Sequence, residues 1–333
     1  MTRRALLVRP GPNFSVEDVA DGWVEGLEAN GWDVQIADLS GILAYHQQAL
    51  MACKLDDERT RAGALASAVI RQMCFDWWPE LVVIVSAFFI SPETFRIIRA
   101  RGMKVVTVLT ESPYEDDNQI KIAALADVAV VNDPTNLDRF PSNTIYLPHA
   151  YRPSIHRPQE PVPEAVSDFC FVGTAYPSRI EFFEQVDFDG IDVALAGNWQ
   201  GLSPDSPLHK HLAHDIESCC PNDWTAKLYA STQASCNVYR TEAQRPELSE
   251  GWAMTPREVE LAASGTFYLA QPRGENREVL PMVPAFDGPQ DFGEQLRWWL
   301  AHPTERAHVV REARAAVADR TFENHATQLL QHL

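Results

Sequence analysis

Short runs of apolar residues alternate along this chain with segments of helical periodicity, and this alternation is the feature that most constrains its fold. The clearest runs are ELVVIVS at 80–86 and KVVTVLT at 104–110. A strand that is apolar at every position is buried on both faces, which is typical of parallel sheets covered by helices. A helical segment over 92–101 separates the two runs and ends at Gly102. The pattern therefore predicts a parallel α/β sheet with right-handed crossovers.

The same alternation occurs twice, in two halves of similar size. In the first half we expect strands at 5–9, 33–38, 80–86, 104–110, 127–131 and 144–147, with helices at 16–30, 62–76 and 92–101. A proline-rich stretch, PHAYRPSIHRPQEPVP at 148–163, has the composition of a linker. Beyond it we expect strands at 168–173, 192–196, 234–238, 266–270 and 283–286, with helices at 178–186, 223–231, 255–264, 289–301 and 303–318 and a final one at the C-terminus. The predicted domains are 1–150 and 164–318, joined by the linker 151–163, with 319–333 as a C-terminal helix.

The segment TPREVELAASGTFYLA at 255–270 predicts a short helix with both ends marked, followed by a buried strand. Thr255 is the expected N-cap, Pro256 occupies the first helical position, and Glu258 stands where a capping box needs a carboxylate. Gly265 is placed for a left-handed C-cap. Arg257 and Glu260 lie three residues apart near the start of this helix, where free N–H groups favour anions. A cation and a carboxylate there suit a nucleotide, with phosphate near the first and ribose hydroxyls near the second.

Composition excludes several classes of protein. The 333 residues have a formal net charge of −18, which argues against a general DNA or RNA binder. No apolar run approaches the roughly 18–20 residues that a membrane span needs, and the start of the chain does not have the pattern of a signal peptide. The six cysteines show no C-x-x-C spacing, so we expect reduced thiols in a cytoplasmic protein.

Two α/β domains joined by a linker are expected to form a cleft, with ligands at the carboxyl ends of the strands. In the first half, the loop after the first strand holds Gly11, Pro12 and Asn13, either at an acceptor or donor or as a plain turn. Glu111 follows a buried strand, where a carboxylate is placed to accept the proton of an acceptor hydroxyl; the alternative is a loop acid. Asp116 and Asp117 are expected to be solvated loop acids.

In the second half, Gly173 and Thr174 follow a strand and precede a helix, where a glycine permits close approach of a phosphate. Arg179 is a candidate diphosphate ligand, with a solvated helix residue as the alternative. Further candidates end the next strands or lie in the linker: Asn198, Trp199, Asn237, Arg240 and His149. Trp199 is expected either to stack on a base or to pack in the core, Asn237 and Arg240 to line a donor site, and His149 to bind acceptor or phosphate or to serve as a hinge contact.

Several segments together resemble GT-B-fold glycosyltransferases of the CgeB-like (spore-maturation type) family. They are YLPHAYRPSIHRP, DFCFVGTAYPSR, TPREVELAASGTFYLA and QDFGEQLRWWLAHPTERAHVVREARAAV, together with TESPYEDD and VVND in the first half. The resemblance covers about four fifths of the chain. It implies two Rossmann-like parallel-sheet domains facing a central cleft, with the acceptor on the first and the donor nucleotide on the second. It also implies that the last helix packs back on the first domain.

The resemblance implies transfer of a sugar from a nucleotide-sugar, most often a UDP-sugar, to an acceptor hydroxyl, with no further cofactor. Glu260 is then the ligand of the donor ribose, and Gly173 and Thr174 lie near the donor phosphates. Arg257 is expected either to contact the donor diphosphate or to hold Glu260 in place. Retaining enzymes of this fold often carry a second glutamate ahead of the first, but Trp252 and Ala253 occupy those positions before Glu260, so the stereochemical course stays open. The D-x-D at 187–189 lies in a predicted turn, and we expect no metal site.

Three alternatives remain open from the sequence. The acceptor is a polysaccharide, a protein or a hydroxymethylated base of phage DNA, and the net charge disfavours DNA. A non-catalytic module that binds a nucleotide-sugar would show the same fold without turnover. A sugar-nucleotide epimerase would convert the donor without any acceptor.

Overall fold

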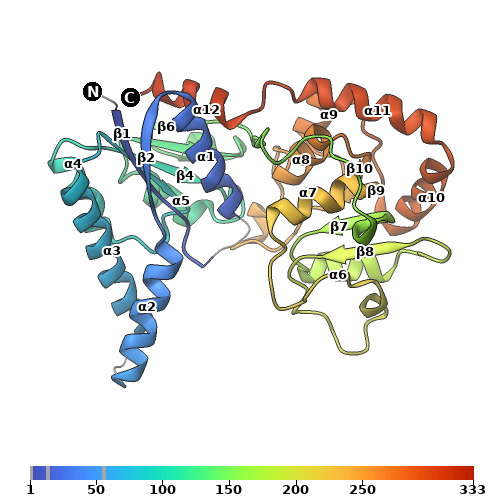
Figure 1. The fold of residues 1–333 in the computed structure, drawn as a ribbon, viewed down its shortest axis with the longest axis horizontal. Coiled ribbons are helices and arrows are strands. Elements are labelled where there is room, and N and C mark those ends of the chain that lie inside the picture. The colour runs from blue at the N-terminus through green and yellow to red at the C-terminus, as the bar shows by residue number, and fades with distance from the viewer. Residues whose placement is uncertain (1–2, 13–15, 55–57) are drawn as a thin grey trace. The chain divides into compact units, whose positions relative to one another are not determined.

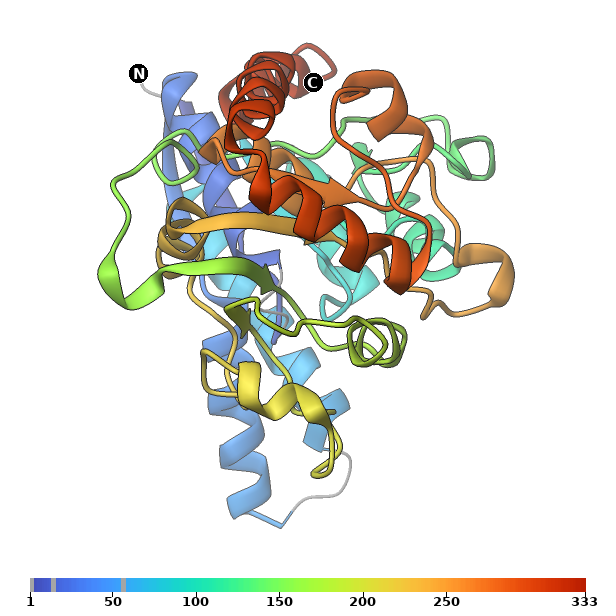
Figure 2. The same ribbon diagram turned by 90° about the vertical axis from the view of Figure 1, so that its right-hand side faces the viewer.

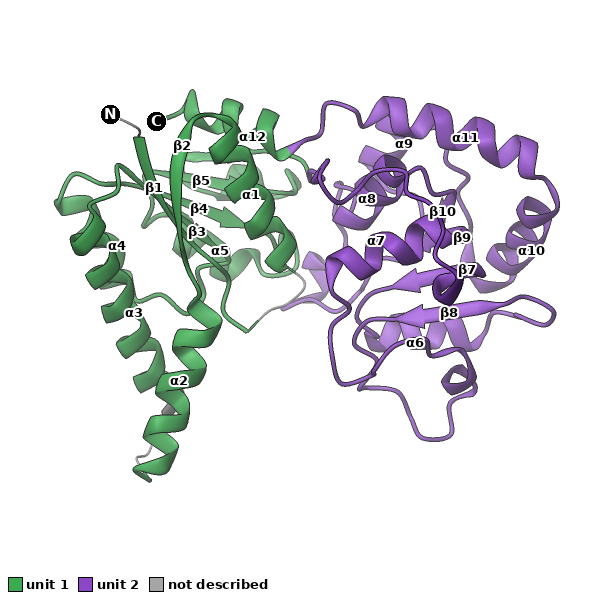
Figure 3. Ribbon diagram, in the orientation of Figure 1, with its two compact units in different colours: residues 1–148, 322–333 green, residues 149–321 purple. Residues whose placement is uncertain are grey.

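The computed structural model describes residues 3–12, 16–54 and 58–333, which divide into two compact units (Figure 3). Unit 1 comprises residues 1–148 and 322–333, and unit 2 comprises residues 149–321. Each unit contains one sheet, and every strand pair in both sheets is parallel. Parallel neighbours require crossover connections, and helices supply most of them, as the alternating sequence pattern predicts.

Unit 1 has a six-stranded sheet in the order β2-β1-β3-β4-β5-β6 (Figure 1). Its strands are β1 (Arg3–Val8), β2 (Trp32–Ala37), β3 (Leu81–Val85), β4 (Lys104–Leu109), β5 (Val128–Val131) and β6 (Thr144–Tyr146). Its helices are α1 (Glu17–Ala29), α2 (Leu39–Ala52), α3 (Glu58–Trp77), α4 (Pro92–Ala100), α5 (Asp116–Ala123) and α12 (Phe322–Leu330), with a 3₁₀ turn at Leu137–Arg139.

The two regions of unit 1 that come from opposite ends of the chain meet where α12 packs on α1. The rings of Trp23 and Phe322 lie 6.0 Å apart, edge to face. A Cβ at Gly22 would collide with the Phe322 ring, and one at Gly26 would collide with the Phe322 backbone. Glycine at these two positions of α1 therefore lets the C-terminal helix approach closely.

Unit 2 has a four-stranded sheet in the order β10-β9-β7-β8, whose strands can be followed in Figure 2. Its strands are β7 (Ser167–Val172), β8 (Val193–Ala196), β9 (Thr232–Asn237) and β10 (Tyr268–Ala270). Its helices are α6 (Pro177–Glu184), α7 (Asn222–Ser231), α8 (Pro256–Ser264), α9 (Gly274–Val279), α10 (Gly288–Ala301) and α11 (Pro303–Ala316). Short 3₁₀ turns lie at Pro163–Ala165, Pro207–His211 and Pro246–Leu248.

Alternate residues of β7 serve two separate apolar clusters, as the two-residue period of a strand requires. Phe169 and Phe171 belong to a cluster with side chains of α6 and α10, and Phe171 and Phe183 lie 4.8 Å apart between ring centroids. Cys170 and Val172 point to the other face and pack with side chains of α7 and α8. Burial on both faces explains why the strand is apolar throughout.

Four elements differ from the sequence-based prediction, and one of them is helix α9, which was not expected. Helix α2 was not expected, although Asp38 gives a start signal that the structure uses: its side chain accepts a hydrogen bond from the Gly41 amide at 3.1 Å. Helix α5 begins at Asp116, where we predicted a loop. The strand predicted at 283–286 is a single bridge between Ala270 and Ala285. Among the described residues, no helix is both long enough and apolar enough to cross a membrane.

Candidate functional site

Helix α8 begins at the carboxyl end of the unit 2 sheet with the end signals that its sequence predicts. Pro256 is in the first turn, and the Glu258 side chain accepts a hydrogen bond from the Thr255 amide at 3.1 Å, as in a capping box. Gly265 ends the helix with φ of +77°. These local signals place Arg257, Glu258 and Glu260 within the first turns of a helix whose start faces the strand ends.

Glu258 is completely buried and is the centre of a hydrogen-bond network. Its carboxylate accepts hydrogen bonds from the Tyr239 hydroxyl at 2.6 Å and from the Asn237 and Asn276 side-chain amides at 2.8 and 2.9 Å. Burial raises the pKa of Glu258, and the hydrogen bonds from Tyr239, Asn276 and Thr255 oppose the rise. A buried carboxylate with this many donors fixes the relative positions of β9, α8 and α9.

Arg257 joins the ends of neighbouring strands. Its Nε donates to the Val172 carbonyl at 2.9 Å, its Nη1 donates to Asn237 Oδ1 at 2.8 Å, and its guanidinium carbon lies 4.4 Å from the centre of the Phe171 ring. A Cβ at Gly173 would collide with its Nη2. Gly173 therefore leaves room for the Arg257 guanidinium where it lies in this structure, and these bonds make Arg257 a residue that positions the site.

In the loop that follows β7, two backbone amides donate hydrogen bonds to carbonyls of the neighbouring chain segment. The Gly173 amide donates to the Ala196 carbonyl at 3.0 Å and the Ala175 amide to the Asn198 carbonyl at 2.8 Å. The Gly173 N–H is thus engaged in the sheet and is not the free phosphate donor that the sequence suggested. The carbonyl of Thr174 accepts a hydrogen bond from Arg179.

The arginines at this edge have different roles. Arg179 is buried and donates from Nε to the Val238 carbonyl at 2.9 Å and from Nη1 to the Thr174 carbonyl at 3.0 Å, so it is neither a solvated residue nor an obvious phosphate ligand. Arg240 is half-buried, donates to the Tyr176 hydroxyl at 2.7 Å and lies over that ring at 5.0 Å. Arg240 is therefore the guanidinium of this edge that is better placed to meet a ligand.

An anion already occupies the start of α6, the helix that follows Gly173 and Thr174. Glu242 accepts from the Ser178 amide at 2.9 Å and from the Ser178 hydroxyl at 3.0 Å. Burial would raise the pKa of Glu242, but these bonds outweigh it and lower the pKa. The start of α6 is thus occupied by a carboxylate of the chain itself.

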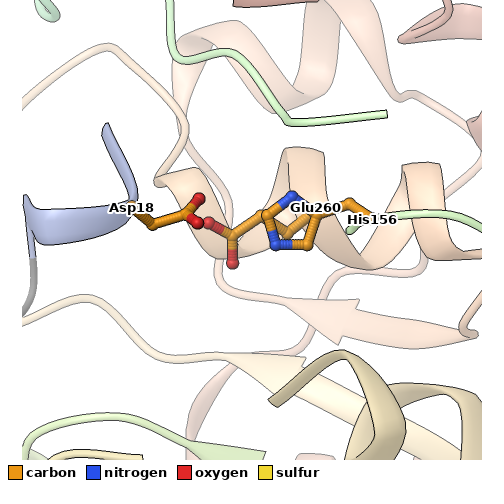
Figure 4. A group of neighbouring side chains, drawn as sticks. All are labelled: Asp18, His156 and Glu260. Atoms are coloured by element: carbon orange, nitrogen blue, oxygen red, sulfur yellow. The ribbon is translucent and has the colours of Figure 1, made fainter. Parts of the chain in front are cut away.

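Glu260 and His156 lie close together in unit 2 (Figure 4). A ring nitrogen of His156 and a carboxylate oxygen of Glu260 are within 4.8 Å of each other. His156 is buried, and its Nδ1 accepts a hydrogen bond from the Arg152 amide at 3.2 Å. Because Nδ1 is an acceptor, the neutral ring carries its proton on Nε2. The Glu260 carboxylate and the His156 imidazole are therefore close enough for one ligand to contact both.

Two other predicted residues of unit 2, Trp199 and Asn237, are structural. Trp199 is fully buried in the core and donates to the Ala196 carbonyl at 3.0 Å, so it has no exposed face for stacking on a base and the packing alternative is correct. Asn237 is fully buried in the Glu258 network. Asn198 is half-buried and accepts from the Gln200 amide at 3.1 Å, and His149 is buried.

The D-x-D segment is a turn, as its sequence predicts. Asp187 accepts a hydrogen bond from the Asp189 amide at 2.9 Å and pairs with Arg297 at 3.1 Å, and Gly190 has φ of +73°.

The carboxyl edge of the unit 1 sheet carries Glu111 and Gly11. Glu111 follows β4 and is half-buried, and its amide donates to the Gln119 side chain at 3.0 Å. Gly11 is buried, and a Cβ there would collide with the Phe89 ring. Pro12 is exposed, and Asn13 lies outside the described residues.

Asp116 corrects the expectation of a solvated loop acid, because only 1% of it is exposed. It accepts hydrogen bonds from the Ser112 hydroxyl at 2.7 Å, the Asn136 amide at 2.8 Å and the Gln119 amide at 3.1 Å. Burial raises the pKa of Asp116 against these bonds. Asp117 is half-buried and forms an ion pair with Arg139 at 2.6 Å.

Several residues of the two edges were missed from the sequence. They are His156, Tyr176, Tyr239, Glu242, Asn276 and, in unit 1, Ser86, which adopts φ of +51° directly after β3 and shares a hydrogen bond with Thr110 at 2.8 Å. Tyr176 and Tyr239 follow strands closely, and that position was a usable signal. Asn276 and Glu242 gave none, because only the folded chain brings them beside Glu258 and Ser178.

Comparison with known proteins supports the fold. Residues 179–331 match the model of a family described as glycosyl transferase-like. Sucrose-phosphate synthase from Thermosynechococcus elongatus matches with a TM-score of 0.64 and 13% identity, over 99% of this chain and 98% of that one. No curated protein matches the chain by sequence.

Two further structures share the fold. Anabaena HepE in complex with UDP matches with a TM-score of 0.56 and 10% identity, over 99% of this chain and 100% of that one. A putative UDP-N-acetylglucosamine 2-epimerase from Listeria monocytogenes matches with a TM-score of 0.57 and 10% identity, over 99% and 95%. At these identities the likeness establishes the architecture: the chain has the GT-B fold, with two parallel-sheet α/β domains, as predicted.

Proposed function

We propose that this protein is a glycosyltransferase that moves a sugar from a nucleotide-sugar to an acceptor hydroxyl. The observation that carries the proposal is that the glycosyl transferase-like match, over 179–331, includes α8 and the polar network at its start. That network combines a helix start, a half-buried guanidinium on Arg240 and the carboxylate of Glu260, which suit the phosphates and ribose of a nucleotide.

Within the proposal, unit 2 binds the donor and unit 1 binds the acceptor. Glu260 accepts hydrogen bonds from the ribose, Arg240 contacts the diphosphate, and Arg257 with Glu258 holds that edge in shape. UDP is the nucleotide that we propose, because HepE is described in complex with UDP. The order of motifs along the chain supports the CgeB-like branch of the fold.

Glu111 is the proposed general base of the transfer. It would take the proton of the acceptor hydroxyl while that oxygen attacks the anomeric carbon and the nucleoside diphosphate leaves. A direct displacement of this kind inverts the anomeric centre. The half-buried position of Glu111 after β4 supports this role.

A thermal-shift and calorimetric screen against UDP, GDP, TDP, ADP and CMP tests the donor site. We expect one nucleoside diphosphate to stabilise the protein by about 2.7 kcal/mol at one hundred times its Kd. Glu260→Gln should weaken that binding by about 10- to 100-fold, because it replaces a charged acceptor of ribose hydroxyls. Glu294→Gln is the matched control, since it removes the same charge from an exposed position of unit 2. No response to any nucleotide would contradict the proposal.

An epimerase is the second candidate, because a structure described as a putative UDP-N-acetylglucosamine 2-epimerase shares the fold. Incubation of the purified protein with UDP-sugars and no acceptor separates the two activities. Conversion of one UDP-sugar to its epimer would favour the epimerase. Slow release of free sugar and UDP favours a transferase that lacks its acceptor, and UDP-sugar binding with neither reaction favours a non-catalytic module.

A further inference from the structure

Unit 2 contains a groove at the end of its sheet opposite to the strand ends that carry the proposed donor site. The groove has a volume of about 820 Å³ and lies at the starts of β9 and β10, at the C-terminal ends of α7 and α8, and along one face of α11. Pockets of roughly 300–1,000 Å³ are typical of small-molecule sites. All of its lining residues belong to unit 2.

The groove follows α11 over most of its length. The lining positions of that helix recur every three or four residues and so form one stripe: Pro303, Arg306, Ala307, Val310, Arg311, Arg314 and Ala315. The small side chains of this stripe leave room above the floor, where Gly265 lies against Pro158 and Val310. The wall is thus partly apolar and open along one side.

The charge of the groove is opposite to that of the protein. Three arginines line it, and no aspartate or glutamate does so among the residues that the structure describes, although the whole chain has a net charge of −18. The acids close enough to affect lining residues are Asp168, which acts on Arg306, Asp319, which acts on Tyr151, and Glu260, which acts on Tyr229. The groove therefore favours an anion.

The three arginines of the groove differ in their hydrogen-bond partners. Arg306 is committed to the fold, since it donates to the Trp299 and Leu300 carbonyls at the end of α10 and to Gln233. Arg311 and Arg314 are exposed and three residues apart on α11, so the two side chains lie next to each other on the helix surface. Arg311 contacts the His308 ring at 3.0 Å, an exposed contact that a stronger acceptor would replace.

We propose that this groove binds a soluble phosphate monoester with a small apolar body. Two neighbouring guanidinium forks match the several oxygens of a dianionic phosphate better than the two oxygens of a carboxylate. Ala307, Val310 and Ala315 form the wall against which the esterified group packs. The net charge of −18 opposes an anionic membrane surface as the source of the phosphate.

Isothermal titration of the full chain with phenyl phosphate tests the site, because this probe has a phosphate monoester and an apolar body but no ribose or base. Arg311→Gln with Arg314→Gln should weaken binding about tenfold or more. Arg96→Gln with Arg101→Gln, two exposed arginines outside the groove, removes the same charge and should leave the affinity within about twofold. Ala315→Trp, at an exposed position, should block the probe by filling the groove.

Saturating UDP separates this proposal from the proposed donor site. Phenyl phosphate should bind equally well with and without UDP, and the groove variants should bind UDP as the unchanged protein does. Displacement of phenyl phosphate by UDP, equal weakening by both double variants, or no binding to the unchanged protein would overturn the groove site. Arginine-dependent sedimentation with vesicles that contain phosphatidic acid, without binding of phenyl phosphate, would also overturn it.

Discussion

The carboxyl edges of the two sheets share a parallel topology but differ in charge. In unit 2, Arg179, Arg240 and Arg257 gather at the strand ends. In unit 1, the acids Glu111 and Asp116 follow β4. Each edge is organised around one buried carboxylate, Glu258 in unit 2 and Asp116 in unit 1, with several hydrogen-bond donors. The same parallel architecture therefore carries arginines at the strand ends of unit 2 and carboxylates after β4 of unit 1, on or near the loops that follow the strands.

The largest effect expected from this difference is on turnover. Glu111→Gln should lower kcat by about 10²- to 10⁴-fold, because it removes the proposed base. The affinity for UDP should stay within about twofold, since Glu111 lies in unit 1 and the proposed donor site lies in unit 2. Steady-state kinetics and calorimetry on the same protein check both values. Glu115→Gln is the control, as this glutamate lies in the same loop and accepts a hydrogen bond only from Asn118 among the bonds found for its side chain. Unchanged turnover in Glu111→Gln would rule out this base.

Removal of the buried carboxylate of unit 2 should have the next largest effect. Glu258→Ala leaves the Tyr239 hydroxyl and the Asn237 and Asn276 amides without their acceptor and opens a cavity, at a cost of about 3–5 kcal/mol. Glu258→Gln keeps the shape and should cost less. Urea unfolding measures the difference, with hydrogen exchange showing whether the loss is confined to unit 2. A loss below about 1 kcal/mol in Glu258→Ala would show that the network is not structural.

A smaller effect on UDP affinity and on stability is expected to distinguish two arginines at the strand ends of unit 2, Arg240 and Arg179. Arg240→Gln should weaken UDP binding by about 10- to 100-fold with little change in stability, because its guanidinium is half-buried and bonded to a side chain. Arg179→Gln should do the reverse and lower stability by about 1–3 kcal/mol, since it bonds two backbone carbonyls in the interior. Thermal melts with and without UDP distinguish the two outcomes. Equal effects of both changes on affinity would mean that the arginines act as one cluster.

The smallest effect is on the pH dependence of stability, and it applies to both edges. Burial raises the pKa of Glu258 above its ordinary value of 4.5 and that of Asp116 above 3.8. A raised folded pKa means that the folded protein holds the proton more tightly, so stability is greatest below these ordinary values and falls as pH rises through the folded pKa. If the folded protein holds the proton tenfold more tightly than the unfolded chain does, the free energy of unfolding falls by about 1.4 kcal/mol when the pH rises through both pKa values.

Glu258→Gln and Asp116→Asn isolate that pH effect, because neither replacement titrates. Relative to each variant, the unchanged protein should lose stability as pH rises from about 4 towards neutral. Urea titrations across this range check the slope. A difference that does not change with pH would show that these carboxylates titrate as they do in the unfolded chain.

Local signals carried much of the prediction. The apolar runs fixed most strands of both sheets, and Thr255, Pro256, Glu258 and Gly265 marked α8 at both ends. These features depend on propensity and on neighbours within a few residues, which the sequence contains directly. The same reasoning failed at α2, where Ser40 and Gly41 obscure the helical pattern, and at 283–286, where an apolar run forms only one bridge.

The roles of individual side chains were decided by tertiary structure. The sequence placed Arg179, Asn237 and Trp199 near strand ends. It did not show that Arg179 would bond backbone carbonyls, that Asn237 would bond Glu258, or that Trp199 would pack in the core. It treated Asp116 as solvated, whereas Ser112, Gln119 and Asn136 enclose it. Periodicity and capping are short-range, so the chain alone determines which elements form and where most of them end. Burial and hydrogen-bond partners come from residues far apart in the chain, as between Asn30 and Glu323, so only the packed fold determines which polar groups are used for structure and which remain for a ligand.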